Sequence, residues 1–356
     1  MFHNRFSGKA RIIGANSQRR PSRPATLEDV ARLAGVHPST ASRSLAERPV
    51  RISSATVERV RAAARTLNYR RDTAAAALRT GNSRLIGVLV PRLTDIVLAT
   101  MYGGLDAEAA AQGYGAVVSN GLDDPLVRTE RLGALLARRI DGVILADARQ
   151  GDTLADELAA GAVPYVLAMR TLPGHVSVST DDAEGGRLAA RHLLELGHRH
   201  VGVAAADPLA STGRDRTAGF REVYAAAGWP VPDARVAATG FGVAAGRRAG
   251  TELAAVEPAL SAVFTVDDYT AVGVMGAMRD AGRTVGADLS LMGYNDVGLG
   301  AELPVPLTSV RSDIDSMGRI SVALLMDRIA GREVSSVLLP PVLVPRSSTV
   351  PVRPGG

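Results

Sequence analysis

Few side chains in this sequence of 356 residues are arranged for catalysis or metal binding. The absence of cysteine excludes disulfides, thiolate metal sites and cysteine nucleophiles. Neither the G-x-S-x-G motif nor a Walker loop occurs. His198 and His200 have a loose metal-ligand spacing, but their place between a predicted helix and a predicted strand favours a simple turn. The sequence therefore predicts neither an enzyme nor a bound metal or cofactor.

Two adjacent carboxylates have the placement of a ligand-binding group. Asp267 and Asp268 follow the apolar segment SAVFTV, a predicted strand, and precede the predicted helix YTAVGVMGAM. A carboxylate there can cap the helix by accepting from its first N–H groups, or it can accept hydrogen bonds from a ligand. Both uses are open for this pair, and Asp268 can serve both.

The positive charge of the chain is concentrated at its N-terminal end. Residues 1–80 hold 16 of the 41 Lys and Arg residues but 5 of the 36 Asp and Glu residues, a net charge of +11 against −6 for residues 81–356. Phosphate neutralisation dominates the affinity of proteins for nucleic acid, so a basic module joined to an acidic body is typical of a DNA-binding protein. A solvated basic tail is the alternative interpretation.

The elements that would carry this charge begin near Thr26. Residues 1–24 hold six basic and no acidic side chains among Ser, Pro, Gly and Asn, which predicts a basic flexible arm or an unstructured leader. TLEDVARLA predicts a helix with Thr26 as its N-cap, and HPSTASRSLA predicts a second helix with Pro38 in its first turn. The apolar stripe of SATVERVRAAARTL predicts a third. A helix-turn-helix DNA-binding domain is thus expected over residues 25–70.

From Leu85 onward, apolar segments alternate between strand and helix patterns. Strands are predicted at LIGVLVP, YGAVVSN, DGVILAD and PYVLAM, and again at HVGVAAAD, SAVFTVDD and LSLMGYND, with amphipathic helices between them. Such series form doubly wound parallel sheets, which bind ligands at the carboxyl ends of their strands. The predicted fold class is α/β: an N-terminal all-α helix-turn-helix domain and a two-lobed core of two doubly wound parallel sheets.

The sequence from about Thr26 to Val350 resembles the lactose-repressor (LacI/GalR) family of bacterial regulators. The similar segments, in family order, are TLEDVARLAGVHPSTASRSL, LNYRRDTAAAALRTG, LGHRHVG, DRTAGF, SAVFTVDDYTAVG, LSLMGYND and PLTSVRSD. The resemblance implies a hinge helix and linker over residues 71–83 and a periplasmic-binding-protein-like core over 84–350. Its lobes are expected over about 84–180 with 313–338 and about 181–312 with 339–350, and the crossings between them near Asp181, Val310 and Leu339.

The resemblance also places the residues that read DNA. The positions expected on operator bases are His37, Pro38, Ser39 and Arg43. Those expected on phosphates are Arg32, Thr40 and Ser42. Arg43 can donate two hydrogen bonds to guanine O6 and N7, although a solvated helix arginine is the plainer alternative. Pro38 departs from the polar residues common at its position, which leaves the base preference beside Arg43 open.

In the hinge segment, Leu78 corresponds to the family's leucine that enters a central base step of the minor groove. Ala75 corresponds to the residue against the groove floor. An apolar wedge of this kind kinks the duplex. We expect the segment to fold only on DNA and in a dimer; packing of Leu78 on the core is the alternative.

For the cleft between the lobes, the resemblance implies effector contacts from seven residues. They are Thr94, Asp95, Arg216, Phe241, Asp268, Asn295 and Asp296. Carboxylate, amide and guanidinium groups bind hydroxyls and Phe241 offers an apolar face, so a sugar or sugar-like metabolite is expected. Asn295 replaces an aspartate frequent in the family, which leaves the particular sugar open. The segment LTDIVL lacks the aromatic residues with which other members stack a purine.

Together these features predict a sequence-specific transcriptional repressor whose operator affinity a small-molecule effector controls. The expected partners are double-stranded DNA with a pseudo-palindromic operator, a carbohydrate and a second copy of the chain, because paired helix-turn-helix modules need a two-fold axis. No apolar run reaches the roughly 18 residues that span a bilayer, so a cytoplasmic protein without membrane contact is expected. A solute-binding protein of a transport system with a fused basic segment is the principal alternative.

Overall fold

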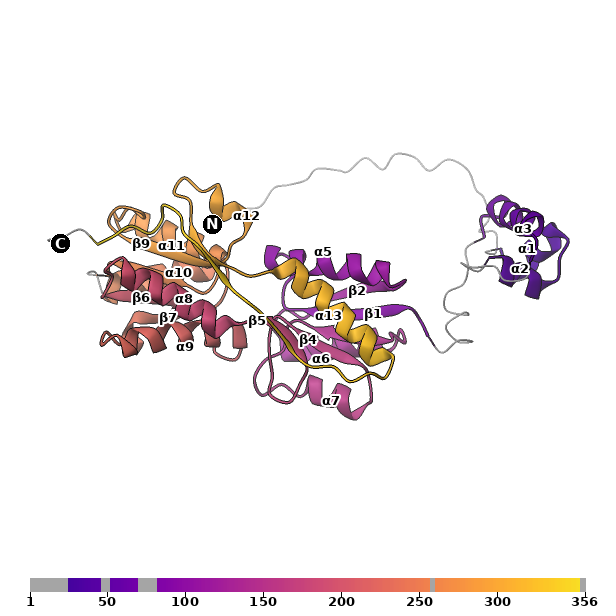
Figure 1. The fold of residues 1–356 in the computed structure, drawn as a ribbon, viewed down its shortest axis with the longest axis horizontal. Helices are drawn as coiled ribbons and strands as arrows, with labels where there is room; N and C mark the ends of the chain where they lie inside the picture. Colours follow the sequence, from indigo (N-terminus) through magenta and orange to yellow (C-terminus); the bar gives the residue numbers. More distant parts are fainter. Residues whose placement is uncertain (1–24, 46–51, 70–81, 257–259, 353–356) are drawn as a thin grey trace, which may run out of the picture. The chain divides into compact units, whose positions relative to one another are not determined.

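The computed structural model describes residues 25–45, 52–69, 82–256 and 260–352, which belong to two compact units. The described part of the small N-terminal unit contains α1 (Leu27–Ala34), α2 (Pro38–Ser44) and α3 (Ser54–Thr66) (Figure 1). Its core is built from small side chains and valines, which lets three short helices approach closely. The fully or nearly buried members are Val30, Ala31, Ala34, Ala41, Val60, Ala63 and Ala64.

Local capping chemistry explains where these helices begin and end. Thr26, the predicted N-cap, forms a capping box with Asp29, in which each side chain accepts from the other residue's backbone N–H. Gly35 ends α1 in the left-handed region at φ 62°, where only glycine is free of strain, and Pro38 occupies the first turn of α2. Arg59 of α3 donates to the carbonyl of Ala34 at 2.9 Å and so ties α3 to the end of α1.

The large unit has two lobes, and lobe 1 is built on a six-stranded parallel sheet with strand order β11-β5-β4-β3-β1-β2. The strands are β1 (Leu85–Val90), β2 (Gly115–Asn120), β3 (Gly142–Leu145), β4 (Tyr165–Ala168), β5 (Ser177–Thr180) and β11 (Val337–Leu339). The helices are α5 (Ile96–Ala111), α6 (Pro125–Leu136), α7 (Leu154–Ala160) and α13 (Ile314–Ile329). Successive residues of β1 enter different cores, Val88 facing α5 and α13 and Leu89 facing α6, so both faces of the sheet are covered.

Lobe 2 repeats the arrangement with strand order β12-β10-β9-β8-β6-β7, in which only β12 runs antiparallel to its neighbour. Its strands are β6 (Val201–Ala205), β7 (Val236–Ala238), β8 (Ala262–Thr265), β9 (Ser290–Asn295), β10 (Thr308–Arg311) and β12 (Val342–Val344). Its helices are α8 (Asp182–Glu195), α9 (Ser211–Ala226), the 3-10 turn η1 (Asp233–Arg235), α10 (Val243–Val256), α11 (Asp268–Asp280) and α12 (Gly298–Ala301). The predicted fold class is confirmed.

The chain passes between the two lobes three times (Figure 1). The crossings connect β5 to α8, β10 to α13, and β11 to β12. The N–H of Asp181 at the first crossing donates to the carbonyl of Leu339 at the third, at 2.9 Å. The strand and helix patterns did not predict β5, α13 or β11, because these elements are short or have weak amphipathic periodicity. In the described ranges, no helix is long and apolar enough to cross a bilayer.

Helices α8 and α9 of lobe 2 pack with their backbones in direct contact. A Cβ atom added to Gly219 would lie 2.0 Å from the carbonyl oxygen of Ala183, and one added to Gly186 would lie 2.1 Å from that of Arg216. Neither obstacle is a flexible side chain, so the helices would have to separate. The contact positions Arg216 on α9 against Asp182 on α8, at 2.7 Å.

We expect Gly219→Ala to lower the free energy of unfolding by about 1 to 3 kcal/mol, because the added methyl group overpacks a rigid backbone contact. Gly133→Ala is the matched control: this glycine lies inside α6 with no atom within 4 Å of the added Cβ. It should leave stability unchanged or raise it by up to about 1 kcal/mol. Urea denaturation of both variants checks this, and equal stabilities would contradict the close contact.

Candidate functional site

The predicted base-reading residues lie at the start and along one side of α2. His37, Ser39 and Arg43 are exposed, and Pro38 is half-buried. Ala41 and Ser44, on the opposite side, are buried against α1 and α3. Arg43 donates from Nε to the carbonyl of Ser39 at 3.2 Å, which orients its guanidinium along the exposed side of the helix.

His37 has a double role at the start of α2. As N-cap, its Nδ1 accepts from the backbone N–H of Ser39 at 3.2 Å and lies 2.8 Å from the Ser39 hydroxyl oxygen. Since Nδ1 is the acceptor, the proton of the neutral imidazole is on Nε2. His37 is exposed, and that N–H makes no hydrogen bond among the described residues, so it is available as a donor to a base or phosphate.

The residues predicted to contact phosphates differ in their exposure and in their existing ion pairs. Arg32 is exposed on α1 and forms an ion pair with Asp29 at 2.9 Å, whereas Thr40 and Ser42 are half-buried on α2. Binding a phosphate through Arg32 would therefore compete with an existing local pair. Ala75 and Leu78 lie outside the described residues, as do the N-terminal residues 1–24.

A cavity of about 260 Å³ lies between the lobes and contains three of the seven predicted effector residues. Lobe 1 contributes Thr94 and Asp95, and lobe 2 contributes Phe241. The wall also includes Arg92, Asp267 and Tyr269, together with the backbone of residues 242–244. The site thus combines two carboxylates, a guanidinium and two aromatic rings. Among the described residues, no three His, Asp or Glu side chains are grouped to hold a metal ion.

Both carboxylates of the cavity are also helix caps. Asp95 accepts from the N–H of Val97 at the start of α5 at 3.0 Å, and Asp267 accepts from the N–H of Thr270 in α11 at 2.8 Å. Burial raises the pKa of Asp95, and the negative charge of Asp267 across the cavity raises it further. Two carboxylates that face one another from different lobes favour a ligand that supplies hydrogen-bond donors.

Arg216, Asp268, Asn295 and Asp296 do not line this cavity. Arg216 is buried within lobe 2, where it pairs with Asp182, donates to the carbonyl of Val266 at 2.7 Å, and lies 3.7 Å from the centre of the Tyr294 ring. In this arrangement the guanidinium contacts the carboxyl-terminal ends of β8 and β9 from within the core of lobe 2. The signal for Arg92 and Tyr269 was present in the sequence, since Arg92 shares the loop after β1 with Thr94 and Tyr269 follows Asp268 in the first turn of α11.

Two family profiles match the chain. Residues 26–72 match the bacterial regulatory proteins of the lacI family, and residues 190–349 match the periplasmic binding protein-like domain. The HTH-type transcriptional regulator CelR of Thermobifida fusca is 32% identical over 332 residues, which cover 90% of this chain and 96% of CelR. The chain belongs to the lacI family.

Solved structures of related regulators have the same fold as this lacI-family chain. A lac repressor dimer bound to operator and the anti-inducer ONPF matches with a TM-score of 0.84 at 29% identity, over 92% of this chain and 100% of that one. A complex of CelR with cellobiose matches with a TM-score of 0.70 at 30% identity, with the same coverage. The predicted family is confirmed, and the protein is a DNA-binding transcriptional regulator, not an enzyme. A solute-binding protein would leave residues 26–72 unexplained.

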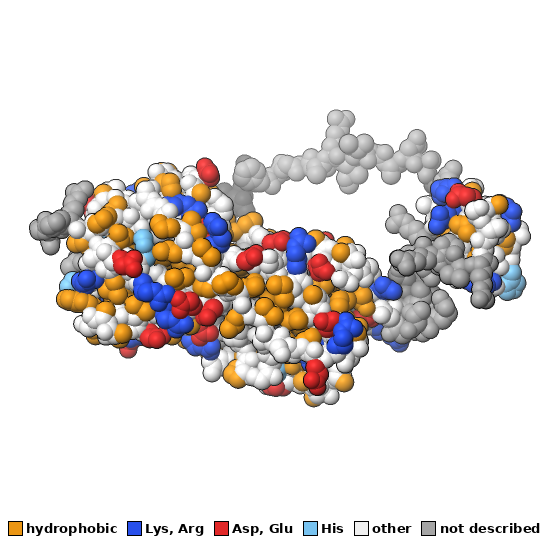
Figure 2. All heavy atoms as spheres, viewed as in Figure 1, with side chains coloured by type: hydrophobic (Ala, Val, Ile, Leu, Met, Phe, Trp, Pro, Cys, Tyr) orange, Lys and Arg blue, Asp and Glu red, His pale blue; other side chains and the backbone are white. Residues whose placement is uncertain are grey.

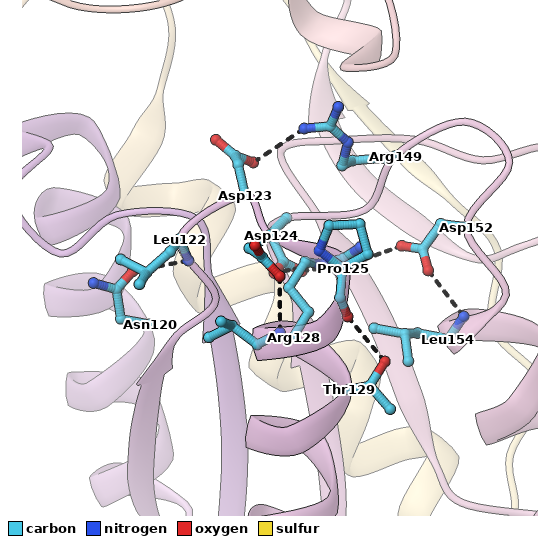
Figure 3. A network of polar contacts seen from close by, with 12 residues as sticks. Asn120, Leu122, Asp123, Asp124, Pro125, Arg128, Thr129, Arg149, Asp152 and Leu154 are labelled. Atoms are coloured by element: carbon cyan, nitrogen blue, oxygen red, sulfur yellow. Dashed lines mark hydrogen bonds and ion pairs between the residues drawn. The ribbon is translucent and has the colours of Figure 1, made fainter.

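Polar contacts beside the cavity hold the two lobes of this lacI-family regulator together. Arg149, in the loop after β3, forms an ion pair at 2.6 Å with Asp207 of lobe 2. The N–H of Gln150 donates to the carbonyl of Leu209 in lobe 2 at 2.9 Å. Within lobe 1, Arg149 faces Asp123 at 3.8 Å (Figure 3). The sequence patterns did not reveal this contact, because Arg149 and Asp207 are 58 residues apart in loops.

A buried arginine fixes the loop that carries Arg149. Arg128 of α6 is 2% exposed, pairs with Asp147 at 2.7 Å, and reaches Asp152 at 2.5 Å (Figure 3). A buried guanidinium is tolerated only when its charge and donors are satisfied, so this pairing constrains the loop on both sides of Arg149.

The end of β9 in lobe 2 is bent by two residues in the left-handed region. Asn295 has φ 95° and Asp296 has φ 53°, conformations that amide and carboxylate side chains adopt more readily than most. Asp296 accepts a hydrogen bond from Arg311 at 2.8 Å and forms an ion pair with Arg346 at 2.7 Å. These ion pairs stabilise the bend, which directs the chain away from the sheet and into α12.

Asp268 connects the same bend to α11 and β10. It is 2% exposed and accepts from the Ser309 hydroxyl at 2.6 Å and from the N–H of Val297 at 2.7 Å. Burial raises its pKa to about 7, and the charges of Asp267 and Asp296 act in the same direction, although both hydrogen bonds lower it.

Asp268 should therefore make stability depend on pH. Its pKa rises from an ordinary 3.8 to about 7 on folding, so its stabilising contribution is complete below 3.8 and is lost as the pH rises through 7. The slope is about 1.4 kcal/mol per pH unit. We expect the wild-type melting temperature to fall over this range more steeply than that of Asp268→Asn, as measured by calorimetry.

Asp280→Asn is the control for this titration. Asp280 ends the same helix, α11, but it is exposed, and hydrogen bonds from Arg279 and Arg247 lower its pKa. This variant should keep the wild-type slope near neutral pH. Identical slopes for wild type and Asp268→Asn would mean that Asp268 stays ionised in the folded chain.

Proposed function

We propose that this regulator is a repressor whose affinity for operator DNA is controlled by a sugar or sugar-like effector bound between its lobes. The observation that carries the proposal is the cavity to which both lobes contribute a carboxylate. Asp95 and Asp267 can accept from hydroxyls, and Phe241 and Tyr269 offer ring faces to the apolar face of a pyranose. The complex of the related CelR with cellobiose supports this chemical class.

A ligand that joins both walls would favour one arrangement of the lobes. Its hydrogen bonds to Asp95 and Asp267 form together only when the lobes are close, so it binds one state more tightly. The differential affinity needed for control is typically 1 to 3 kcal/mol, about 5- to 150-fold. By linkage, the operator must weaken effector binding by the same factor if the effector is an inducer.

On the DNA side, His37, Pro38, Ser39 and Arg43 are proposed to meet bases, with Arg32, Thr40 and Ser42 on phosphates. In the hinge segment, residues 71–83, Leu78 is proposed to enter a central base step of the minor groove, and Ala75 is proposed to lie against the groove floor. We place this regulator in the bacterial cytoplasm, where operator DNA is. A basic arm over residues 1–24 would add contacts that do not depend on sequence.

A homodimer is proposed because two half-sites of a pseudo-palindromic operator require two helix-turn-helix modules. The lac repressor structure that this chain matches is itself a dimer. Apolar side chains gather on the face of the large unit drawn in Figure 2. The exposed large apolar side chains of this unit include Ile96 on α5, Leu299 on α12 and Leu338 on β11. Exposed apolar area of this kind supports association with a second copy.

Arg43→Ala should weaken operator binding by about 5- to 150-fold, since a bidentate guanine contact is worth about 1 to 3 kcal/mol. Fluorescence anisotropy at fixed salt, with a pseudo-palindrome from upstream of the gene itself, measures the effect. Arg61→Ala is the control, because Arg61 is an exposed arginine on α3 that pairs with Glu58 at 3.8 Å. If both variants lost the same operator affinity, and the wild type bound operator no more tightly than random DNA, the domain would bind phosphates without reading bases.

Asp95→Asn should weaken the effector while preserving the fold, because asparagine also caps helices well. Cellobiose and a panel of monosaccharides are titrated against the operator complex, and the variant should need about tenfold more of the active sugar for release. Asp106→Asn, on the exposed side of the same helix α5, should behave as wild type. If no sugar changes operator affinity, the carbohydrate assignment is wrong.

A further inference from the structure

A second cavity lies at the edge of the lobe 2 sheet opposite to the inter-lobe cavity. Its volume is about 600 Å³, and its lining residues come from the segments that precede β6, β7, β8 and β9, from the start of β9, and from the segment after β12. The side chains that decide its chemistry are Arg199, His200, Trp229, Arg283 and Asp288. Doubly wound sheets bind their usual ligands at the other edge, so this pocket is separate from the proposed effector site.

The pocket has two guanidinium groups that no carboxylate in the described ranges neutralises. Arg199 donates to the carbonyl of Leu194 at 2.9 Å, and Arg283 donates from Nη2 to the carbonyls of Leu260 and Asp288 at 2.7 and 2.8 Å. Nη1 of Arg283 is buried without a hydrogen-bond partner among the described residues. A buried donor left without an acceptor is costly, which an incoming anion would correct.

The one acidic side chain of the pocket does not offset this charge directly. The carboxylate of Asp288 accepts from the N–H of Thr284 at 2.9 Å and so closes its own turn. His200 accepts at Nδ1 from a guanidinium N–H of Arg235 at 3.3 Å, which holds its ring in the wall of the pocket. The pocket therefore favours a negatively charged ligand.

Trp229 gives the pocket a flat apolar wall. Its indole is 43% exposed, the Arg199 guanidinium lies 5.9 Å from the ring centre, and the His200 ring meets it edge-on at 6.2 Å. The N–H of Trp229 donates to the carbonyl of Tyr224 at 2.9 Å, across Gly228 in the left-handed region at φ 83°. This backbone hydrogen bond ends the helix and fixes the backbone position from which the indole projects.

We propose that this pocket binds a small organic anion that carries a planar ring. The carboxylate or phosphate of the ligand pairs with Arg199 and Arg283, and its ring packs against Trp229. Full affinity requires both a negative charge and an aromatic ring in the ligand. Inorganic phosphate cannot pack against Trp229, and an uncharged aromatic molecule cannot pair with the two arginines. This site does not depend on the proposed function of the inter-lobe cavity.

The chain contains a single tryptophan, so indole fluorescence reports on this pocket alone. Phenyl phosphate is titrated into the full-length protein, with inorganic phosphate and benzyl alcohol as the two partial ligands. We expect a saturable change in Trp229 emission with phenyl phosphate, at a concentration at least about tenfold below that of either partial ligand. Equal responses to phenyl phosphate and benzyl alcohol, or no saturable response, would overturn the proposal.

Arg199→Met should weaken phenyl phosphate about tenfold, because it removes the charge and keeps an apolar chain beside the indole. Arg248→Met is the matched control: among the described residues, this exposed arginine of α10 likewise donates to carbonyls, those of Ala244 and Thr239. Calorimetry gives the stoichiometry, expected to be one per chain, and circular dichroism checks folding. Equal weakening in both variants, or unchanged binding in Arg199→Met, would contradict the assignment.

Discussion

The C-terminal part of the chain completes both lobes of this regulator, because it contributes a strand to each sheet and a helix to lobe 1. The arrangement of the rest of the large unit depends on this connection. After β10 of lobe 2, α13 covers lobe 1, β11 joins the edge of the lobe 1 sheet, and β12 returns to form the outermost strand of lobe 2 beside β10. Pro340 and Pro341 alone separate β11 from β12, and proline restricts the backbone there. The lobes are therefore fixed at one side of the cleft, and relative motion is confined to rotation about the crossings.

The positions of the charged groups in the cleft follow from this arrangement of the lobes. The loops after β1 and β8 approach each other from different lobes, and each contains a carboxylate already committed to a helix N-terminus. A capping aspartate is held still by its own helix, so Asp95 and Asp267 present preorganised acceptors. Arg149 and Asp207 oppose the separation that two facing carboxylates would otherwise favour. In the proposed function, a ligand that joins both walls shifts the balance between this ion pair and that repulsion.

Local pattern was sufficient for much of this structure. The capping box of Thr26 and the αL end at Gly35 are short-range chemistry, which the sequence contains directly, and the long apolar strands could be predicted in the same way. Short β11 and the weakly amphipathic α13 acquire their structure from packing between distant segments, which no local pattern records. The same limit applies to the site: Thr94, Asp95 and Phe241 share the cavity, but family position alone did not show that Arg216 and Asp268 are occupied inside lobe 2.

The backbone contact between α8 and α9 has a mechanical consequence. Helices that meet through long side chains can slide by exchanging rotamers, but at Gly186 and Gly219 there is no side chain to exchange. The pair must move as one stiff rod. That rod begins at Asp182, beside the first crossing, and α9 leads from the cleft edge of lobe 2 to Trp229 at the opposite edge. A rotation of lobe 2 at the crossings is therefore expected to displace the segment around Trp229 together with α8 and α9.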